Sequence, residues 1–176
     1  VDKMPLVEVI RAKESSDEAV ASIVAFSKKL GKTPIVVKDA PGFVVNRILG
    51  PYLNEAVFLI LEGVPVAEID EVMEKFGMPM GPCALLDEIG LDVAAKVSKV
   101  LYGAFGERMK PPPVFGTLAE PGRLGKKTGK GIFIYEGKKK TVDTTLLGKL
   151  GVKEKTSDLT SEIIVKRLIY IMINEA

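Results

Sequence analysis

Residues 35–56 read IVVKDAPGFVVNRILGPYLNEA, and this stretch decides how the chain is built. Its first three residues are an apolar run typical of a strand, and a Pro-Gly turn follows them at Pro41 and Gly42. The apolar spacing after the turn predicts a long helix, whose first turn carries one amide, Asn46. A strand-to-helix junction holds a side chain rigidly from both sides, which makes Asn46 a candidate ligand-binding residue. The alternative is an amide that bonds the neighbouring backbone, and this stretch alone leaves both readings open.

The residues before the junction predict a strand, a helix and a second strand. Residues 6–10 are typical of a short strand, Ser16 is the expected N-cap of a helix that Gly31 closes, and residues 33–37 form the next strand. Two strands joined by one helix form a βαβ unit with parallel strands. Because parallel strands are normally buried in a larger sheet, we expect residues 1–39 to be the remnant of a doubly wound parallel sheet.

The rest of the chain is predicted to be mainly α. Apolar periodicity and glycine stops indicate successive helices separated by short loops. A polar connection is expected to begin at Lys138. The other expected elements are helices over residues 43–62 and 66–76, a short helix through Leu85 and Leu86, a helix capped by Asp92 that runs to about Phe105, a strand over residues 132–135, a small helix near residues 144–150, and a final helix capped by Ser161.

The final helix repeats an earlier one. Residues 164–176 align with residues 44–56, with Arg167 opposite Arg47 and a second Asn-Glu-Ala at the same offset. Chance similarity between amphipathic helices is the alternative, but the shared Arg and tripeptide favour a duplication. The second copy carries Lys166 where the first has Asn46. We expect the chain to be cut at both ends, since the βαβ unit and the second copy are each incomplete.

Composition narrows the function classes. The 176 residues carry a net charge of +2, 47% hydrophobic residues and no membrane-length apolar run, which argues against nucleic-acid partners and a membrane span. The single Cys83 excludes an intrachain disulfide, fits a reducing, cytoplasmic compartment and is expected to be a buried, inert thiol. The sequence contains no histidine, so we expect no metal site.

Several charged residues have competing interpretations. Glu8 lies in an apolar strand and needs a partner there, unless it faces solvent at a sheet end. Asp87 and Glu88 are neighbours and do not share a helix face, so we interpret them as capping or surface charges. The lysines between Lys126 and Lys140 are interpreted as a solvated basic loop, with phosphate binding as the alternative. The spacing of a phosphate-binding loop fails because position 120 is Glu, and no Gly-x-Gly-x-x-Gly motif occurs.

Four stretches resemble the L-3-hydroxyacyl-CoA dehydrogenase family. The resemblance is strongest to the dehydrogenase part of the multifunctional fatty-acid oxidation complex alpha subunit, and it covers nearly the whole chain in the family's order. The residues that carry it are VDKMPLVEVI at 1–10, PGFVVNR at 41–47, GMPMGP at 77–82 with LLD at 85–87, and GKKTGKG at 125–131. The segment FGERM at residues 105–109 and the second helical copy favour the multifunctional branch of the family.

The resemblance implies a function and its site residues. The family oxidises L-3-hydroxyacyl-CoA to 3-ketoacyl-CoA with NAD, using a His that a Glu orients. Glu8 falls on that Glu, whereas the His would lie five residues before Val1. Asn46 falls on the Asn that bonds the oxygen at the reacting carbon, so Glu8 and Asn46 are the implied catalytic residues. Lys127 falls on an NAD contact, and the segment that flanks the acyl cleft falls on Met80, Gly81 and Pro82.

The resemblance also implies an organisation. We expect residues 1–39 to be a remnant of the NAD-binding domain, 40–140 the helical C-terminal dehydrogenase domain, 141–160 a linker and 161–176 the start of a second helical repeat. The fragment alone is expected to be inactive, with a homodimer or subunit contact through its helical part. The alternatives are a helical assembly module and a 3-hydroxybutyryl-CoA dehydrogenase relative.

Overall fold

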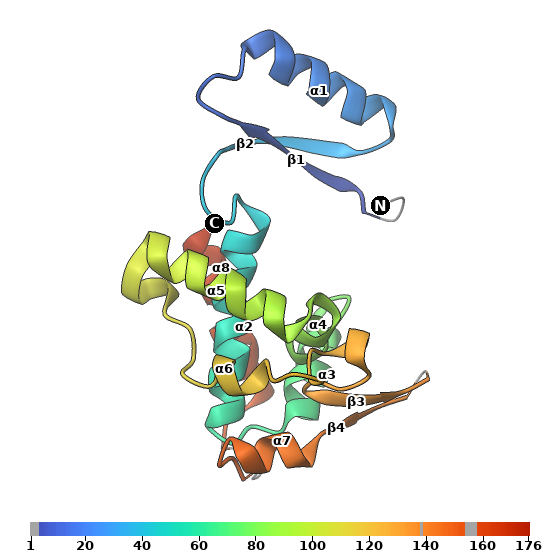
Figure 1. Ribbon diagram of the computed structural model, residues 1–176, viewed down its shortest axis with the longest axis vertical. Helices are drawn as coiled ribbons and strands as arrows, with labels where there is room; N and C mark the ends of the chain where they lie inside the picture. Colours follow the sequence, from blue (N-terminus) through green and yellow to red (C-terminus); the bar gives the residue numbers. More distant parts are fainter. Residues whose placement is uncertain (1–3, 138, 154–157) are drawn as a thin grey trace. The chain divides into compact units, whose positions relative to one another are not determined.

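The computed structural model describes residues 4–137, 139–153 and 158–176. The chain divides into two compact units, residues 1–47 and residues 48–176, and each is described by itself. In the first unit, β1 (Leu6–Arg11) and β2 (Thr33–Lys38) pair in parallel, with Leu6 opposite Thr33. They are joined by α1 (Asp17–Lys29), which Ser16 caps by accepting a hydrogen bond from the Ala19 N–H at 3.1 Å. The predicted βαβ unit is therefore confirmed (Figure 1).

The second unit is built mainly of helices (Figure 1). Helix α2 begins within the first unit, and its residues from Ile48 belong to the second. A short antiparallel hairpin completes this unit. The α-helices and strands of the second unit are α2 (Val45–Leu61), α3 (Val66–Phe76), α4 (Pro82–Ile89), α5 (Leu91–Phe105), α6 (Phe115–Leu118), β3 (Phe133–Glu136), β4 (Lys139–Val142), α7 (Thr144–Lys149) and α8 (Ser161–Glu175). None of the helices in the described ranges is long and apolar enough to cross a membrane.

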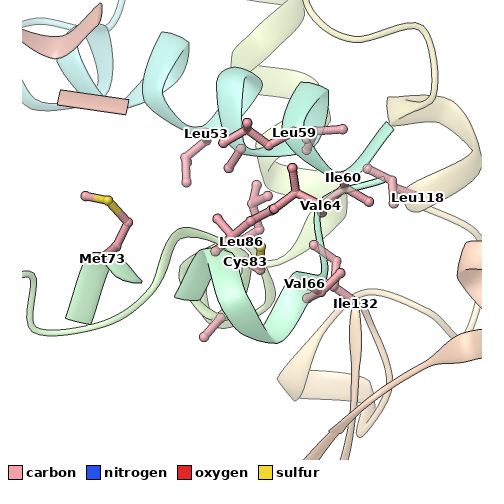
Figure 2. Packing of buried hydrophobic residues seen from close by; sticks show 14 of the residues in the cluster. Leu53, Leu59, Ile60, Val64, Val66, Met73, Cys83, Leu86, Leu118 and Ile132 are labelled. Atoms are coloured by element: carbon pink, nitrogen blue, oxygen red, sulfur yellow. The ribbon is translucent and has the colours of Figure 1, made fainter. Parts of the chain in front are cut away.

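The hydrophobic core of the second unit gathers side chains from α2 to α8 and from β3. Figure 2 shows part of it, where residues of α2, α3 and α4 pack with Leu118 of α6 and with Ile132. Leu59, Met73 and Leu86 are fully buried there. Cys83 is also fully buried, as predicted, and its burial raises the pKa of the thiol well above its usual value. A neutral, inaccessible thiol is an unreactive one.

Two predicted helix caps are wrong, one by a single residue and the other by two. Helix α8 is capped by Thr160, whose hydroxyl oxygen accepts from the Ile163 N–H at 3.3 Å, rather than by Ser161. Helix α5 begins at Leu91 directly after Gly90, so Asp92 lies in its first turn and is not the cap. Gly90 has a φ of 99°, a conformation that glycine adopts easily, and this lets the chain pass directly from α4 into α5.

Strand β4 was missed by the sequence analysis, which expected a polar connection from Lys138. The strand pairs antiparallel with β3, with Phe133 opposite Val142. Its lysines hide the strand pattern, yet lysine is common on exposed edge strands, where it discourages pairing with other chains.

Helix α8 is tied to α2 by one arginine. The Nε of Arg167 donates to Glu55 at 2.6 Å, and its Nη1 donates to Glu62 at 2.5 Å. Hydrogen bonding to Arg167 holds the pKa of Glu62 below its usual value. Helix α8, which the sequence repeat leads us to interpret as a second copy of α2, is thus anchored to α2 and to Glu62 directly after it by charge-assisted hydrogen bonds.

Candidate functional site

Glu8 of β1 has a partner, which resolves the choice left open by the sequence. Its Oε1 accepts hydrogen bonds from the backbone N–H of Val44 at 2.8 Å and of Val45 at 3.2 Å. Val45 is the first residue of α2 and Val44 directly precedes it, and N–H groups at a helix start have no partner within the helix. Within the described residues, the second carboxylate oxygen of Glu8 accepts no hydrogen bond. Glu8 therefore keeps one oxygen available to a further donor.

The turn before α2 aims those two N–H groups at Glu8. The Phe43 N–H donates to the carbonyl oxygen of Ala40 at 2.9 Å, and Gly42 has a φ of 77°. Phe43 itself has a φ of 46°, and it is the sole non-glycine residue with positive φ in the described part of the chain. The predicted helix start at Phe43 is therefore wrong, because Phe43 belongs to the turn. An aromatic residue in this conformation is rare and strained, and such residues concentrate at functional sites.

Asn46 is the second residue of α2 and is exposed. Its side chain makes no hydrogen bond to the residues that the structure describes, so the backbone-bonded alternative is not observed. Asn46 lies two positions after Val44, whose N–H donates to Glu8. The strand, the turn and the first helical turn thus place an accessible amide in the helix start that Glu8 binds.

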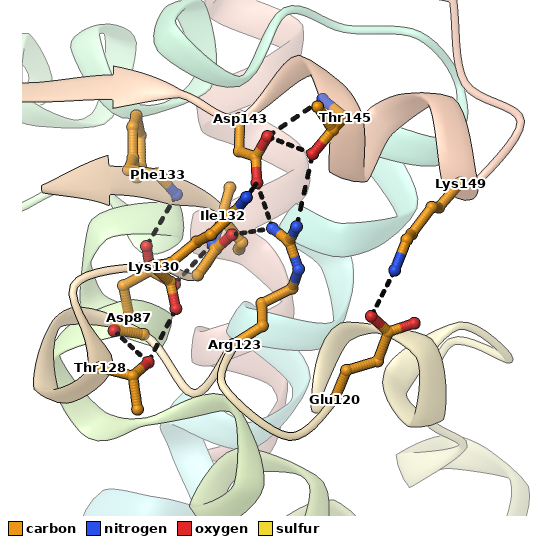
Figure 3. A network of polar contacts seen from close by, with 12 residues as sticks. Asp87, Glu120, Arg123, Thr128, Lys130, Ile132, Phe133, Asp143, Thr145 and Lys149 are labelled. Atoms are coloured by element: carbon orange, nitrogen blue, oxygen red, sulfur yellow. Dashed lines mark hydrogen bonds and ion pairs between the residues drawn. The ribbon is translucent and has the colours of Figure 1, made fainter.

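In the second unit, Asp87 is a buried acceptor, so its interpretation as a surface or capping charge is wrong. Its carboxylate is 0% exposed and accepts from the N–H groups of Ile132 and Phe133, each at 2.9 Å, and from the Tyr135 hydroxyl at 3.0 Å (Figure 3). Burial raises the pKa of Asp87, while these donors oppose the rise. Its neighbour Glu88 is exposed and pairs with Lys126 at 2.7 Å, as a surface charge does.

The Gly/Lys loop folds around Asp87. A Cβ on Gly131 would lie 2.0 Å from the Asp87 Oδ1, so no side chain fits there. The Thr128 hydroxyl oxygen accepts from the Leu124 N–H at 2.9 Å and closes the loop on itself. Gly131 is therefore explained by a close approach of the loop backbone to a buried carboxylate, and Gly125 by its approach to the Asp87 backbone.

Lys127 lies in this loop and forms an ion pair with Asp92 in the first turn of α5. The hydrogen bond to Lys127 lowers the pKa of Asp92. Three further lysines of the stretch expected to be a solvated loop are also ion-paired. Lys126 pairs with Glu88 on the surface. Lys130 and Lys140 contact buried carboxylates, Asp143 at 3.4 Å and Asp70 at 3.3 Å. The Lys127 side chain remains 44% exposed, so its ammonium is accessible to an anionic ligand.

The Met80–Pro82 segment is held by Asp70. The Asp70 carboxylate accepts from the N–H groups of Cys83 at 2.8 Å and Ala84 at 3.1 Å, the first turn of α4. A Cβ on Gly81 would lie 2.2 Å from the Asp70 Cγ, so this position requires glycine. Gly81 and Pro82 are buried, whereas Met80 lines a cavity of about 440 Å³. The side chains that share this cavity with Met80 include Lys126, Tyr135 and Lys140.

Asp70 and the buried role of Asp87 were not predicted from the sequence. Asp70 had a readable signal, because residues 66, 69, 70 and 73 share one helix face and the other three are apolar. A carboxylate on an apolar face predicts a buried acceptor. Asp87 had a weaker signal, since its donors come from residues more than 40 positions later in the chain.

Comparison with protein families gives two adjacent matches. Residues 1–40 match the model of the 3-hydroxyacyl-CoA dehydrogenase NAD-binding domain, and residues 42–135 match that of the 3-hydroxyacyl-CoA dehydrogenase C-terminal domain. The boundary between the matches falls in the turn that precedes Val44.

Curated proteins and solved structures resemble the chain over long stretches. It is 49% identical over 176 residues to the fatty acid oxidation complex subunit alpha of Vibrio campbellii, covering 100% of this chain and 25% of that protein. The chain thus spans about a quarter of the length of such relatives. The (S)-3-hydroxybutyryl-CoA dehydrogenase of Ralstonia eutropha is 46% identical with a TM-score of 0.72, over 77% of this chain and 49% of that one. The dehydrogenase part of multifunctional enzyme 1 from C. elegans is 27% identical with a TM-score of 0.68, over 98% of this chain and 40% of that one.

Proposed function

Because the chain belongs to the 3-hydroxyacyl-CoA dehydrogenase family, we propose that it contributes the substrate amide and the histidine-orienting carboxylate to an NAD-dependent oxidation of L-3-hydroxyacyl-CoA in fatty-acid β-oxidation. The observation that carries this proposal is the pairing of Glu8 with the helix start that presents Asn46. The resemblance of the surrounding motifs implies that both residues fall on the family's site positions.

Each side chain has a role suited to its chemistry. Oxidation of a hydroxyl group removes its proton while hydride leaves the carbon, and a base near neutral pH does this best. The free oxygen of Glu8 would accept from an imidazole N–H and fix its tautomer. The Asn46 amide would donate to the oxygen that becomes a carbonyl, where a fixed neutral donor stabilises developing charge.

The match to the NAD-binding model indicates NAD as the cofactor, which accepts the hydride when bound. Among the residues present, Lys127 fits this group, because its ammonium is held by Asp92 and stays accessible. We propose that Lys127 contacts NAD from the Gly-rich loop.

The substrate class proposed is an acyl-CoA thioester. Met80 lines the cavity of about 440 Å³ on the α4 side, and we propose that its segment flanks the acyl chain. The resemblance to a 3-hydroxybutyryl-CoA dehydrogenase keeps short acyl chains as the alternative to longer ones. Turnover of substrates with acyl chains of increasing length decides between them.

We predict that Asn46 is needed for turnover when this chain replaces the matching quarter of the Vibrio campbellii relative. The folded chimera should produce NADH from a 3-hydroxyacyl-CoA, and Asn46→Ala in it should lower kcat by about 100-fold, the usual cost of one transition-state hydrogen-bond donor. The 176-residue chain alone should produce no NADH, because it contains no histidine to act as the family's base.

Asn174→Ala is the matched control for Asn46→Ala. Asn174 is also an exposed helical asparagine, in α8, and its loss should leave kcat within about twofold. A folded chimera that makes no NADH, or NADH production by the 176-residue chain alone, would contradict the proposal.

We further propose that the helical part self-associates, which is the assembly role the sequence analysis kept as an alternative. A groove of about 570 Å³ between α3 and α8 is lined by Val72, Phe76, Val165 and Tyr170, among others. Phe76 and Tyr170 are 52% and 55% exposed, and exposed apolar surface of this kind favours a protein partner.

A second copy of the chain is the partner we expect at this groove. Sedimentation equilibrium should show a dimer that Tyr170→Glu weakens by at least about tenfold, because a carboxylate would be desolvated in the contact. Val100→Glu on α5 is the control, since Val100 is equally exposed but does not line the groove. A monomeric wild-type chain would contradict self-association.

A further inference from the structure

We propose that Glu8 is a positioning residue for Asn46, acting through the backbone of the first turn of α2 and independently of any imidazole. The role of Asn46 as a substrate contact rests on the proposed function, whereas the positioning of Asn46 by Glu8 does not. Glu8 would thus set the geometry of the amide as well as that of the base.

The start of α2 is not stabilised by an acidic side chain from the helix itself. The first turn contains no acidic residue, although a carboxylate there would stabilise the positive end of the helix. The carboxylate comes instead from Glu8, 36 positions earlier, on the neighbouring strand. It takes up two N–H groups that would otherwise lack a partner within the helix.

The contact fixes Asn46 because nothing flexible lies between them. Val45 donates to Glu8 and is followed directly by Asn46. On the other side of Val44, Phe43 is held at a φ of 46°, a strained value that persists only where surrounding contacts enforce it. The bonds from Val44 and Val45 to Glu8 are contacts of that kind.

The hydrogen bonds between Glu8 and the start of α2 also connect the two segments of the chain that match family models. Glu8 lies in the segment that matches the NAD-binding domain, while Val44, Val45 and Asn46 lie in the segment that matches the C-terminal domain. A side chain that links these two segments is well placed to register the substrate amide against the cofactor-binding part of the fold.

Amide hydrogen exchange on the 176-residue chain tests this directly, because the chain contains no histidine through which Glu8 could act. Glu8→Ala should speed the exchange of the Val44 and Val45 N–H groups by about tenfold, the effect of losing a helix cap, and should shift the side-chain amide resonances of Asn46. Glu8→Gln should keep both close to wild type, since the glutamine oxygen still accepts. Unchanged exchange in Glu8→Ala, or no rescue by Glu8→Gln, would overturn the proposal.

Two further variants guard the test. Glu8→Asp keeps the charge and the strand but shortens the reach, so it should speed the same two amides even if Glu8→Ala fails to fold. Glu14→Ala, in the exposed turn before α1, should not change the exchange of either amide.

In the chimera, Glu8→Gln should lower kcat with KM unchanged, whereas Glu8→Ala should also raise KM. An inactive chimera would count against the proposed function alone, because the exchange measurements do not depend on turnover.

Discussion

Replacing Asp87 by alanine is expected to lower the free energy of unfolding of the chain by about 3–5 kcal/mol. The carboxylate is fully buried and serves three donors, the N–H groups of Ile132 and Phe133 and the Tyr135 hydroxyl (Figure 3). Alanine would leave these donors without an acceptor in a region closed to water. It would also open a space against Gly131, where the loop approaches most closely.

Urea denaturation followed by far-ultraviolet circular dichroism measures this loss, which suits a chain without tryptophan. Asp87→Asn should also destabilise, because one of the two oxygens becomes an N–H₂ donor that faces a backbone N–H. Glu88→Ala is the control, and the loss of its exposed ion pair with Lys126 should cost at most about 1 kcal/mol. Equal losses at positions 87 and 88 would show that the buried network does not stabilise the fold.

Local patterns predicted most of the secondary structure. Helix α3 was predicted with its observed bounds, because its apolar period and its terminal Gly77 agree. The parallel pairing of β1 and β2 followed from the spacing of strand, helix and strand. Strand β4 was missed because its lysines mask the alternation that marks a strand.

The candidate site was predicted only in part, because its contacts are long-range. The sequence indicated Glu8 and Asn46, yet the hydrogen bonds that Val44 and Val45 donate to Glu8 join residues about 36 positions apart. No local pattern carries such a pairing. The positive φ of Phe43 was likewise unpredictable, since a strained turn is set by its surroundings and not by its own propensity.

Arg123→Met is expected to destabilise the chain by about 3–5 kcal/mol, because it leaves a buried carboxylate without its main partner. Arg123 and Asp143 are 6% and 1% exposed and form an ion pair, and Arg123 also donates to the Gly131 carbonyl oxygen at 2.9 Å (Figure 3). Adding Asp143→Asn to Arg123→Met should recover part of the loss. Asparagine has no charge to desolvate and can still cap α7 by accepting from the Thr145 N–H, as Asp143 does at 3.0 Å.

The exposed pair in the same network is the matched control. Lys149 contacts Glu120 at 2.5 Å on the surface, and Lys149→Met should cost less than about 1 kcal/mol.

The stabilisation that the buried pair of Arg123 and Asp143 contributes should also depend on pH. Burial works against ionisation of Asp143, but Thr145 and Arg123 outweigh it and hold the pKa of Asp143 below that of an unfolded aspartate. Its contribution is therefore complete above the unfolded value of about 3.9 and is lost as the pH falls through the lower folded value. The difference in unfolding free energy between wild type and Arg123→Met should narrow in that acidic range, and a difference independent of pH would show that Arg123 acts by packing and not by charge.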